Sequence, residues 1–186
     1  MTFHNYRGTV TASFEGFNDT YYFGRRPTSV MMPNFRNVYK QETDFLRGYM
    51  VHYSADRMGW QAGFGKDGIG ASYKDSLLEP GDWNVFMMMQ GENIPLESNT
   101  VSLHKDLKDS WGIPQLVTDI DYAENDLKLL NDFHEQASEM LGGAGCKNIQ
   151  AIDSQQAPGL DIHEMGGIRM GNDPKSSALN KWSQAH

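Results

Sequence analysis

The sequence predicts an α+β protein, in which a mostly antiparallel or mixed sheet packs with helices. Three observations lead to this prediction. Segments with the two-residue alternation of strands outnumber segments with helical periodicity. The predicted strands are separated by turns rich in Gly and Asn, which are too short for repeated βαβ crossovers. One long segment near residue 130 carries apolar residues at helical spacing, and its apolar stripe should lie on the sheet.

The first predicted strand covers residues 9–14, where Val10, Ala12 and Phe14 alternate with hydroxyl side chains. Two longer strands, over 44–54 and 83–90, are apolar on both faces, so we expect both faces to be covered and 83–90 to be central. Shorter strands are predicted over 21–23, 29–33, 59–64, 99–103, 115–119 and 147–152. Pro33 is expected either to end strand pairing or to mark an edge of the sheet.

One helix is clear. Its expected apolar stripe consists of Leu127, Leu130, Phe133, Ala137, Met140 and Leu141. Asp121 or Asn125 is expected to cap its start, and Gly142 to terminate it. Residues 63–68 match G-x-G-x-x-G, but no amphipathic helical pattern follows them, so we interpret them as a hairpin loop rather than a dinucleotide-binding turn.

Composition limits the function classes. The 186 residues suffice for one domain with a substantial core. Hydrophobic content of 39% and a mean hydropathy of -0.59 are typical of a soluble protein, and no apolar run approaches the roughly 20 residues of a membrane span. A formal net charge of -8, with scattered Lys and Arg, argues against nucleic acid as a partner. The single cysteine, Cys146, excludes a cysteine-based metal cluster, and no other pattern predicts a metal site.

Most of the chemistry in the sequence lies in residues 163–174, H-E-M-G-G-I-R-M-G-N-D-P. A titratable imidazole, His163, precedes the glycine pair Gly166 and Gly167. Glycines at such positions allow the backbone to approach a flat or bulky group, although they also simply make tight turns. On spacing alone, a histidine beside two glycines is more often an ordinary loop residue than a catalyst.

The run G-L-D-I-H-E-M-G-G-I-R-M-G over residues 159–171, with Leu179-Asn180 and residues 183–186 after it, resembles the active-site histidine segment of glucose-methanol-choline (GMC) oxidoreductases. These FAD enzymes oxidise CH–OH groups of alcohols and sugars. The resemblance to their bacterial sugar and gluconate dehydrogenase branch extends over most of the chain. It implies that His163 faces the flavin as the general base, and that Gly166 and Gly167 let the backbone approach the flavin ring.

The resemblance also implies a division of the chain. Residues 1–156 are expected to form the substrate-binding sheet domain, and residues 157–186 the catalytic-histidine loop with the start of the return to an FAD domain. We expect the FAD-binding domain and a second catalytic residue to lie outside this chain. The isolated chain should then bind no FAD tightly, be inactive, and self-associate through its exposed domain interface. Its partners would be a sugar or alcohol substrate and the FAD domain.

The alternative is a free-standing carbohydrate-binding or interaction module without redox activity. Aromatic residues offer some support, since a row of them on strands forms a stacking platform for a pyranose ring. The candidates are Tyr49, Tyr53, Trp60, Tyr73 and Trp83. The sequence does not name the substrate, the electron acceptor or the compartment.

Overall fold

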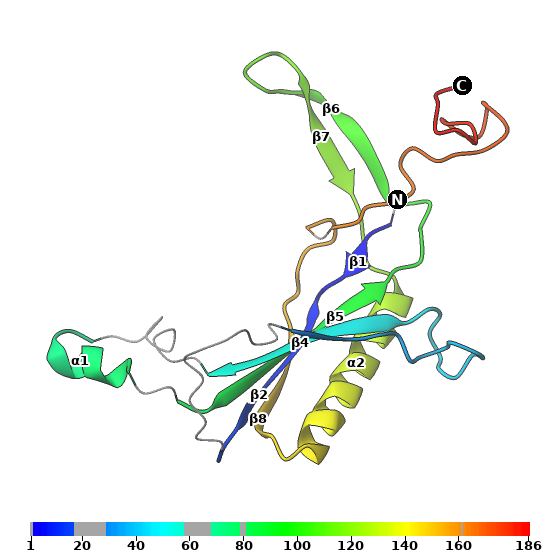
Figure 1. Ribbon diagram of the computed structural model, residues 1–186. Helices are drawn as coiled ribbons and strands as arrows, with labels where there is room; N and C mark the ends of the chain where they lie inside the picture. The colour runs from blue at the N-terminus through cyan, green and yellow to red at the C-terminus, as the bar shows by residue number, and fades with distance from the viewer. Residues whose placement is uncertain (1, 17–28, 58–67, 79–80, 161) are drawn as a thin grey trace.

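The computed structural model describes residues 2–16, 29–57, 68–78, 81–160 and 162–186. Its centre is one antiparallel sheet, with β1 paired beside β5 (Figure 1). In spatial order the path of the sheet is β3 (Val30–Met32), β4 (Tyr49–Arg57), β5 (Trp83–Glu92), β2 (Gly8–Phe14) and β8 (Lys147–Asp153), and β1 is His4–Asn5. The α+β class and the central position of 83–90 are confirmed, and the strand before Pro33 lies at an edge of the sheet.

Helix α2 (Glu124–Gly143) covers one face of this sheet (Figure 1). The register explains how: Val10, Met87 and Tyr53 are direct partners across β2, β5 and β4, and all three face the helix. The buried cluster contains Val10, Ala12, Phe45, Tyr49, Val51, Met87, Met89, Leu129, Leu130, Phe133, Ala137 and Leu141. Because successive side chains on a strand alternate in direction, the next ladder of residues faces away from the helix.

The start of β4 differs from the prediction. The strand begins at Tyr49, whereas 44–48 forms bends. Side-chain amides form hydrogen bonds with the backbone groups of this segment. The Asn37 amide donates to the carbonyl of Phe45 at 3.0 Å, and the Leu46 N–H donates to the Asn125 amide oxygen at 2.7 Å. Phe45 still reaches the core, while Leu46 is 56% exposed. The expectation that both faces of 44–54 are covered is therefore wrong at Leu46, and the predicted strand is not formed over 44–48.

The predicted helix is present, but its ends and part of its stripe were wrong. Ala123 is the N-cap, and the Asp126 carboxylate accepts its N–H at 2.8 Å, so neither Asp121 nor Asn125 caps the helix. The helix continues through the predicted stop to Gly143. Leu127 and Met140 are each 43% exposed, whereas Leu129 is fully buried, so the stripe is rotated from the predicted one.

The remaining elements are one short helix and two strands outside the main sheet. Helix α1 (Ala71–Ser76) was missed, because it buries no residue and so carries no apolar period. Strands β6 (Thr100–Lys108) and β7 (Pro114–Asp119) confirm two predicted strands, but they form a separate two-stranded ribbon that projects from the sheet (Figure 1). The strands predicted over 21–23 and 59–64, and most of the 63–68 turn, lie outside the described residues.

A three-residue network holds the segment before β4 against α2. Asp132 on α2 receives two hydrogen bonds from the Arg36 guanidinium, at 2.9 and 2.8 Å, and one from the Tyr49 hydroxyl at 2.7 Å. Burial of Tyr49, followed by its bond to Asp132, raises the pKa of its hydroxyl above the usual range. The phenol therefore stays protonated and serves as a donor.

Candidate active site

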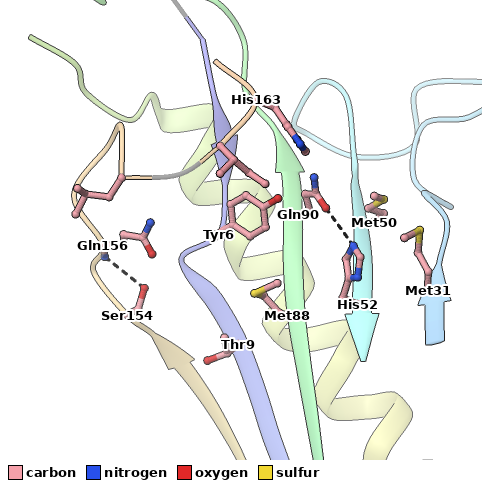
Figure 2. A pocket seen from close by; sticks show the side chains of 12 residues that line it. Tyr6, Thr9, Met31, Met50, His52, Met88, Gln90, Ser154, Gln156 and His163 are labelled. Atoms are coloured by element: carbon pink, nitrogen blue, oxygen red, sulfur yellow. Dashed lines mark hydrogen bonds between the residues drawn. The ribbon is translucent and has the colours of Figure 1, made fainter. Parts of the chain in front are cut away.

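The face of the sheet opposite α2 carries a cavity of about 730 Å³ (Figure 2). Its volume lies within the range of small-molecule sites, roughly 300–1,000 Å³. The lining consists of Tyr6, Thr9, Met31, Met50, His52, Met88, Gln90, Ser154, Gln156, Leu160, Ile162 and His163. Strands β2 to β5 supply the floor, and the chain after β8 supplies one wall.

The floor follows from strand register. Met31, His52, Met88 and Thr9 are direct partners across β3, β4, β5 and β2, so they form one row on the open face. Directly opposed side chains on antiparallel strands have Cβ atoms about 4.5–5.5 Å apart. The sequence predicted that the strand carrying Met50 and His52 has two apolar faces, but it did not identify these two residues as part of a site. The alternation of residues along one strand shows which side chains share a face. It does not show which residues of the neighbouring strands lie beside them, because that depends on the pairing register.

His163 enters the cavity from the segment after β8 (Figure 2). Its φ of 66° is in the left-handed region, which is uncommon for residues other than glycine and costs on the order of 1–3 kcal/mol. Two hydrogen bonds hold the next residues in place: Thr2 and Met165 exchange N–H to carbonyl bonds at 2.9 Å each. The N-terminal end of the chain therefore fixes the backbone on which His163 stands.

The His4 ring supports the His163 ring directly. The two imidazoles meet edge to face, with centroids 5.0 Å apart. Nδ1 of His4 lies 3.3 Å from the carbonyl oxygen of Gly91, so it is the protonated nitrogen that donates to β5. This hydrogen bond orients the His4 ring. Because the two rings are in contact, it also helps to hold the His163 ring over the end of the sheet.

The start of the same segment is tied to the sheet by Arg7. Its guanidinium makes a two-pronged ion pair with Asp153, at the end of β8, and lies 4.9 Å from the centre of the Tyr122 ring. The Arg7 carbonyl accepts the N–H of Ser154 at 3.0 Å. The hydrogen bond from Arg7 lowers the pKa of Asp153 below its ordinary value.

This pair predicts a pH dependence. The lowered pKa of Asp153 means that its contribution to stability is complete above the ordinary value of 3.8 and is lost as the pH falls through the lowered value. Asp153→Asn should therefore lower the free energy of unfolding at neutral pH, and the difference from the unsubstituted chain should shrink in acid. Urea unfolding of both proteins at several pH values measures the difference between their free energies of unfolding. The contributions of the other titrating groups cancel in this difference, because both proteins contain them. A difference that stays constant into acid would contradict it.

The glycine pair follows His163. Gly166 has a φ of 83°, which favours glycine, and a Cβ on Gly167 would meet no atom within 4 Å. The backbone beside the histidine is thus left open to an approaching group. Nε of Arg169 donates to the carbonyl of Ser176 at 2.8 Å. Among the described residues, this side chain therefore makes a hydrogen bond to the nearby backbone and is not part of an ion pair.

Comparison with known proteins identifies the family of the segment that carries His163. The family model of the GMC oxidoreductases matches residues 95–186, which include α2, β8 and the His163 segment. Residues 95–186, about half of the chain, belong to the GMC oxidoreductases. The resemblance seen in the sequence is confirmed, and the α+β architecture is that of a GMC C-terminal, substrate-binding region.

Two curated relatives show how much of a longer protein this chain matches. The 2-methyl-1,2-propanediol dehydrogenase of Mycolicibacterium austroafricanum is 34% identical over 118 residues, which cover 62% of this chain and 21% of that protein. The gluconate 2-dehydrogenase flavoprotein of Pantoea cypripedii is 24% identical over 124 residues, covering 62% of this chain and 20% of that protein. The chain spans about a fifth of the length of these relatives.

Among the described residues, Tyr49 and Tyr53 do not contribute to the aromatic platform that was predicted for a sugar. Tyr49 is 2% exposed and Tyr53 packs on the same core, so both face α2 rather than the cavity. Trp60 lies outside the described residues.

Within the described ranges, no group of three or more His, Cys, Asp or Glu side chains is arranged to hold a metal ion. A search of the same residues finds no helix long and apolar enough to cross a membrane.

Proposed function

We propose that this chain supplies the substrate side of an FAD-dependent oxidoreductase, which oxidises a CH–OH group of a sugar, a sugar acid or another alcohol. The observation that carries the proposal is the placement of His163 in a cavity of ligand size, on a backbone held in the left-handed region beside an open glycine pair. Family membership supports the reaction class, and the name of the Pantoea cypripedii relative supports the flavin.

The described residues fit an adjacent flavin. Gly166 adopts a backbone conformation that favours glycine, and Gly167 faces open space, so a flat ring system can approach this backbone without meeting a Cβ. When bound, FAD accepts the hydride released by the alcohol carbon. Gly166 and Gly167 are therefore the residues of this chain proposed to face the cofactor.

His163 is the proposed general base. Neutral imidazole accepts the hydroxyl proton of the substrate while the carbon of the same group loses its hydride, so the alcohol becomes a carbonyl compound. An imidazole ring can both accept and donate a proton, which suits it to general acid–base catalysis. The His4 ring, 5.0 Å away, limits how far the base can turn from the cavity. The second catalytic residue expected from the family resemblance is proposed to come from outside this chain.

The chain alone is proposed to hold no FAD tightly and to be inactive. Pyrophosphate binding in such enzymes needs a strand, a Gly-rich turn and a packed helix in that order. Helix α2 follows β7 through residues 120–123, which contain no glycine, and α1 buries no residue. The partners proposed for this chain are thus the substrate and an FAD domain. Its 157–186 segment is the proposed contact with that domain.

Exposed apolar side chains on the β6–β7 ribbon support the proposal that the isolated chain self-associates. Leu103 and Leu116 are direct partners on one face of the ribbon, with exposures of 63% and 66%, and Trp111 at its tip is 84% exposed. A two-stranded ribbon with such a face is marginally stable in water by itself, so contact with other apolar surface would stabilise it.

Anaerobic flavin reduction tests the proposed function. The full native polypeptide that carries these residues is mixed with gluconate, glucose or 2-methyl-1,2-propanediol, and flavin absorbance is followed. We expect bound flavin and its bleaching by at least one of these alcohols. A polypeptide that binds no flavin, or whose flavin none of the alcohols reduces, would contradict the proposal.

A further inference from the structure

The part of the cavity floor formed by β3, β4 and β5 is apolar except at one point, and the Thr9 hydroxyl lies beyond it on β2. Met31 and Met88 flank His52 in the row across β3, β4 and β5, and Met50 lies beside Gln90 as its direct partner. Thioether side chains are polarisable and adaptable, so they pack well against hydrocarbon. They offer no strong hydrogen bond to a hydroxyl. A substrate on this floor therefore gains from carbon surface and loses where it presents hydroxyl groups without partners.

The exception is the pair formed by His52 and Gln90, whose Nε2 and Oε1 atoms lie 3.2 Å apart (Figure 2). A carbonyl-type oxygen only accepts, so Nε2 of His52 is the donor in this bond. The amide nitrogen of Gln90 then has both hydrogens free, because the described part of the chain gives it no partner. The pair thus presents oriented donors to a ligand from an otherwise apolar part of the floor.

Gln90 lies on the floor beneath His163, and both line the same cavity (Figure 2). Resting on the proposed function, we propose that the substrate is an alcohol with an apolar carbon body and one further oxygen. His163 takes the proton of the reacting hydroxyl, and the Gln90 amide donates to the second oxygen. The carbon body lies on Met31, Met50 and Met88. Vicinal diols of ring size fit this description, whereas any additional hydroxyl of a sugar that lies over the three methionines would be left without a hydrogen-bond partner.

Three compounds that share a six-carbon ring test the inference: cyclohexanol, the vicinal cyclohexanediol and myo-inositol. They carry one hydroxyl, two hydroxyls and a hydroxyl on every carbon. In the full native polypeptide we expect kcat/KM for flavin reduction to be about 3- to 10-fold higher with the diol than with cyclohexanol, the contribution of one hydrogen bond. Myo-inositol should be the poorest of the three.

Gln90→Met should bring the ratio of diol to cyclohexanol close to one, because it removes the donors and keeps the side-chain length. His52→Phe should lower the same ratio to a smaller extent, since it releases the amide from its orientation. The matched control is Gln150→Met, on β8 and outside the cavity lining, which should leave the ratio unchanged. A ratio of two substrates on one protein does not depend on the fraction of enzyme that is correctly folded.

The outcomes separate this inference from the proposed function. Myo-inositol turned over as well as the diol, or a substrate ratio unchanged by Gln90→Met, would overturn the inference while leaving a working oxidoreductase. Turnover of gluconate or glucose without any turnover of the ring diol would overturn it as well. A flavin that no alcohol of either panel reduces would refute the proposed function itself.

Discussion

Replacing His163 by alanine is expected to lower kcat for alcohol oxidation by about 100- to 10,000-fold in the full native polypeptide, the usual contribution of a positioned general base. The effect should fall on kcat more than on KM, because the imidazole acts on the proton that leaves during the reaction. Single-turnover flavin reduction measures this step directly. Flavin content should not change, since the proposed cofactor-facing residues of this chain, Gly166 and Gly167, are untouched.

The control for this variant is His104→Ala. His104 lies on β6, outside the cavity lining, and its Nδ1 accepts the N–H of Leu107 at 2.8 Å. Its loss should leave the rate of flavin reduction unchanged. If His163→Ala reduces flavin as fast as the unsubstituted protein, His163 is not the base, and its strained backbone needs another explanation.

Phe133→Ala is expected to cost about 3–5 kcal/mol of unfolding free energy, the range for truncating a fully buried aromatic side chain. Phe133 has no exposed surface, and its ring meets that of Tyr49 edge to face with centroids 5.7 Å apart. On the sheet side, a Cβ on Gly8 would lie 2.8 Å from the Phe133 ring, so the helix approaches β2 closely. The cavity left by alanine cannot be filled by its neighbours without moving the helix. Urea unfolding of the described chain measures the cost.

Leu127→Ala is the matched control on the same helix. Leu127 is 43% exposed, and surface substitutions of this kind usually stay within about 0.5 kcal/mol. Equal costs for Phe133→Ala and Leu127→Ala would mean that the helix packs with the stripe predicted from sequence rather than the stripe in the structure.

The core strands were predictable because alternation is a local signal. Val10 and Ala12 identify both the first long strand and its buried face without knowledge of any neighbour. The ends of elements were less predictable, because they depend on distant side chains. Asn125 was expected to cap the helix, but its amide pairs with Leu46, 79 residues earlier. Asp126 caps the helix instead, from inside its first turn.

The site shows the same division. His163 and the glycines after it were recognisable from their motif, and family membership is confirmed. The residues that line the rest of the cavity were not found, since His52 and Gln90 come from different strands and meet only through pairing register. His4 was not identified either, because its contact with His163 joins the two ends of the sequence. Such contacts leave no pattern within a short window of sequence.

The role of His163 as the base can be tested with the structure of the flavin-loaded native polypeptide bound to a non-oxidisable analogue of its alcohol. We expect the analogue in the cavity over β4, β5 and β2, with its reacting oxygen within about 2.6–3.2 Å of a ring nitrogen of His163. The flavin should lie beside Gly166 and Gly167. An analogue bound elsewhere, or one whose reacting oxygen faces a different base, would contradict the proposed roles of the cavity and of His163.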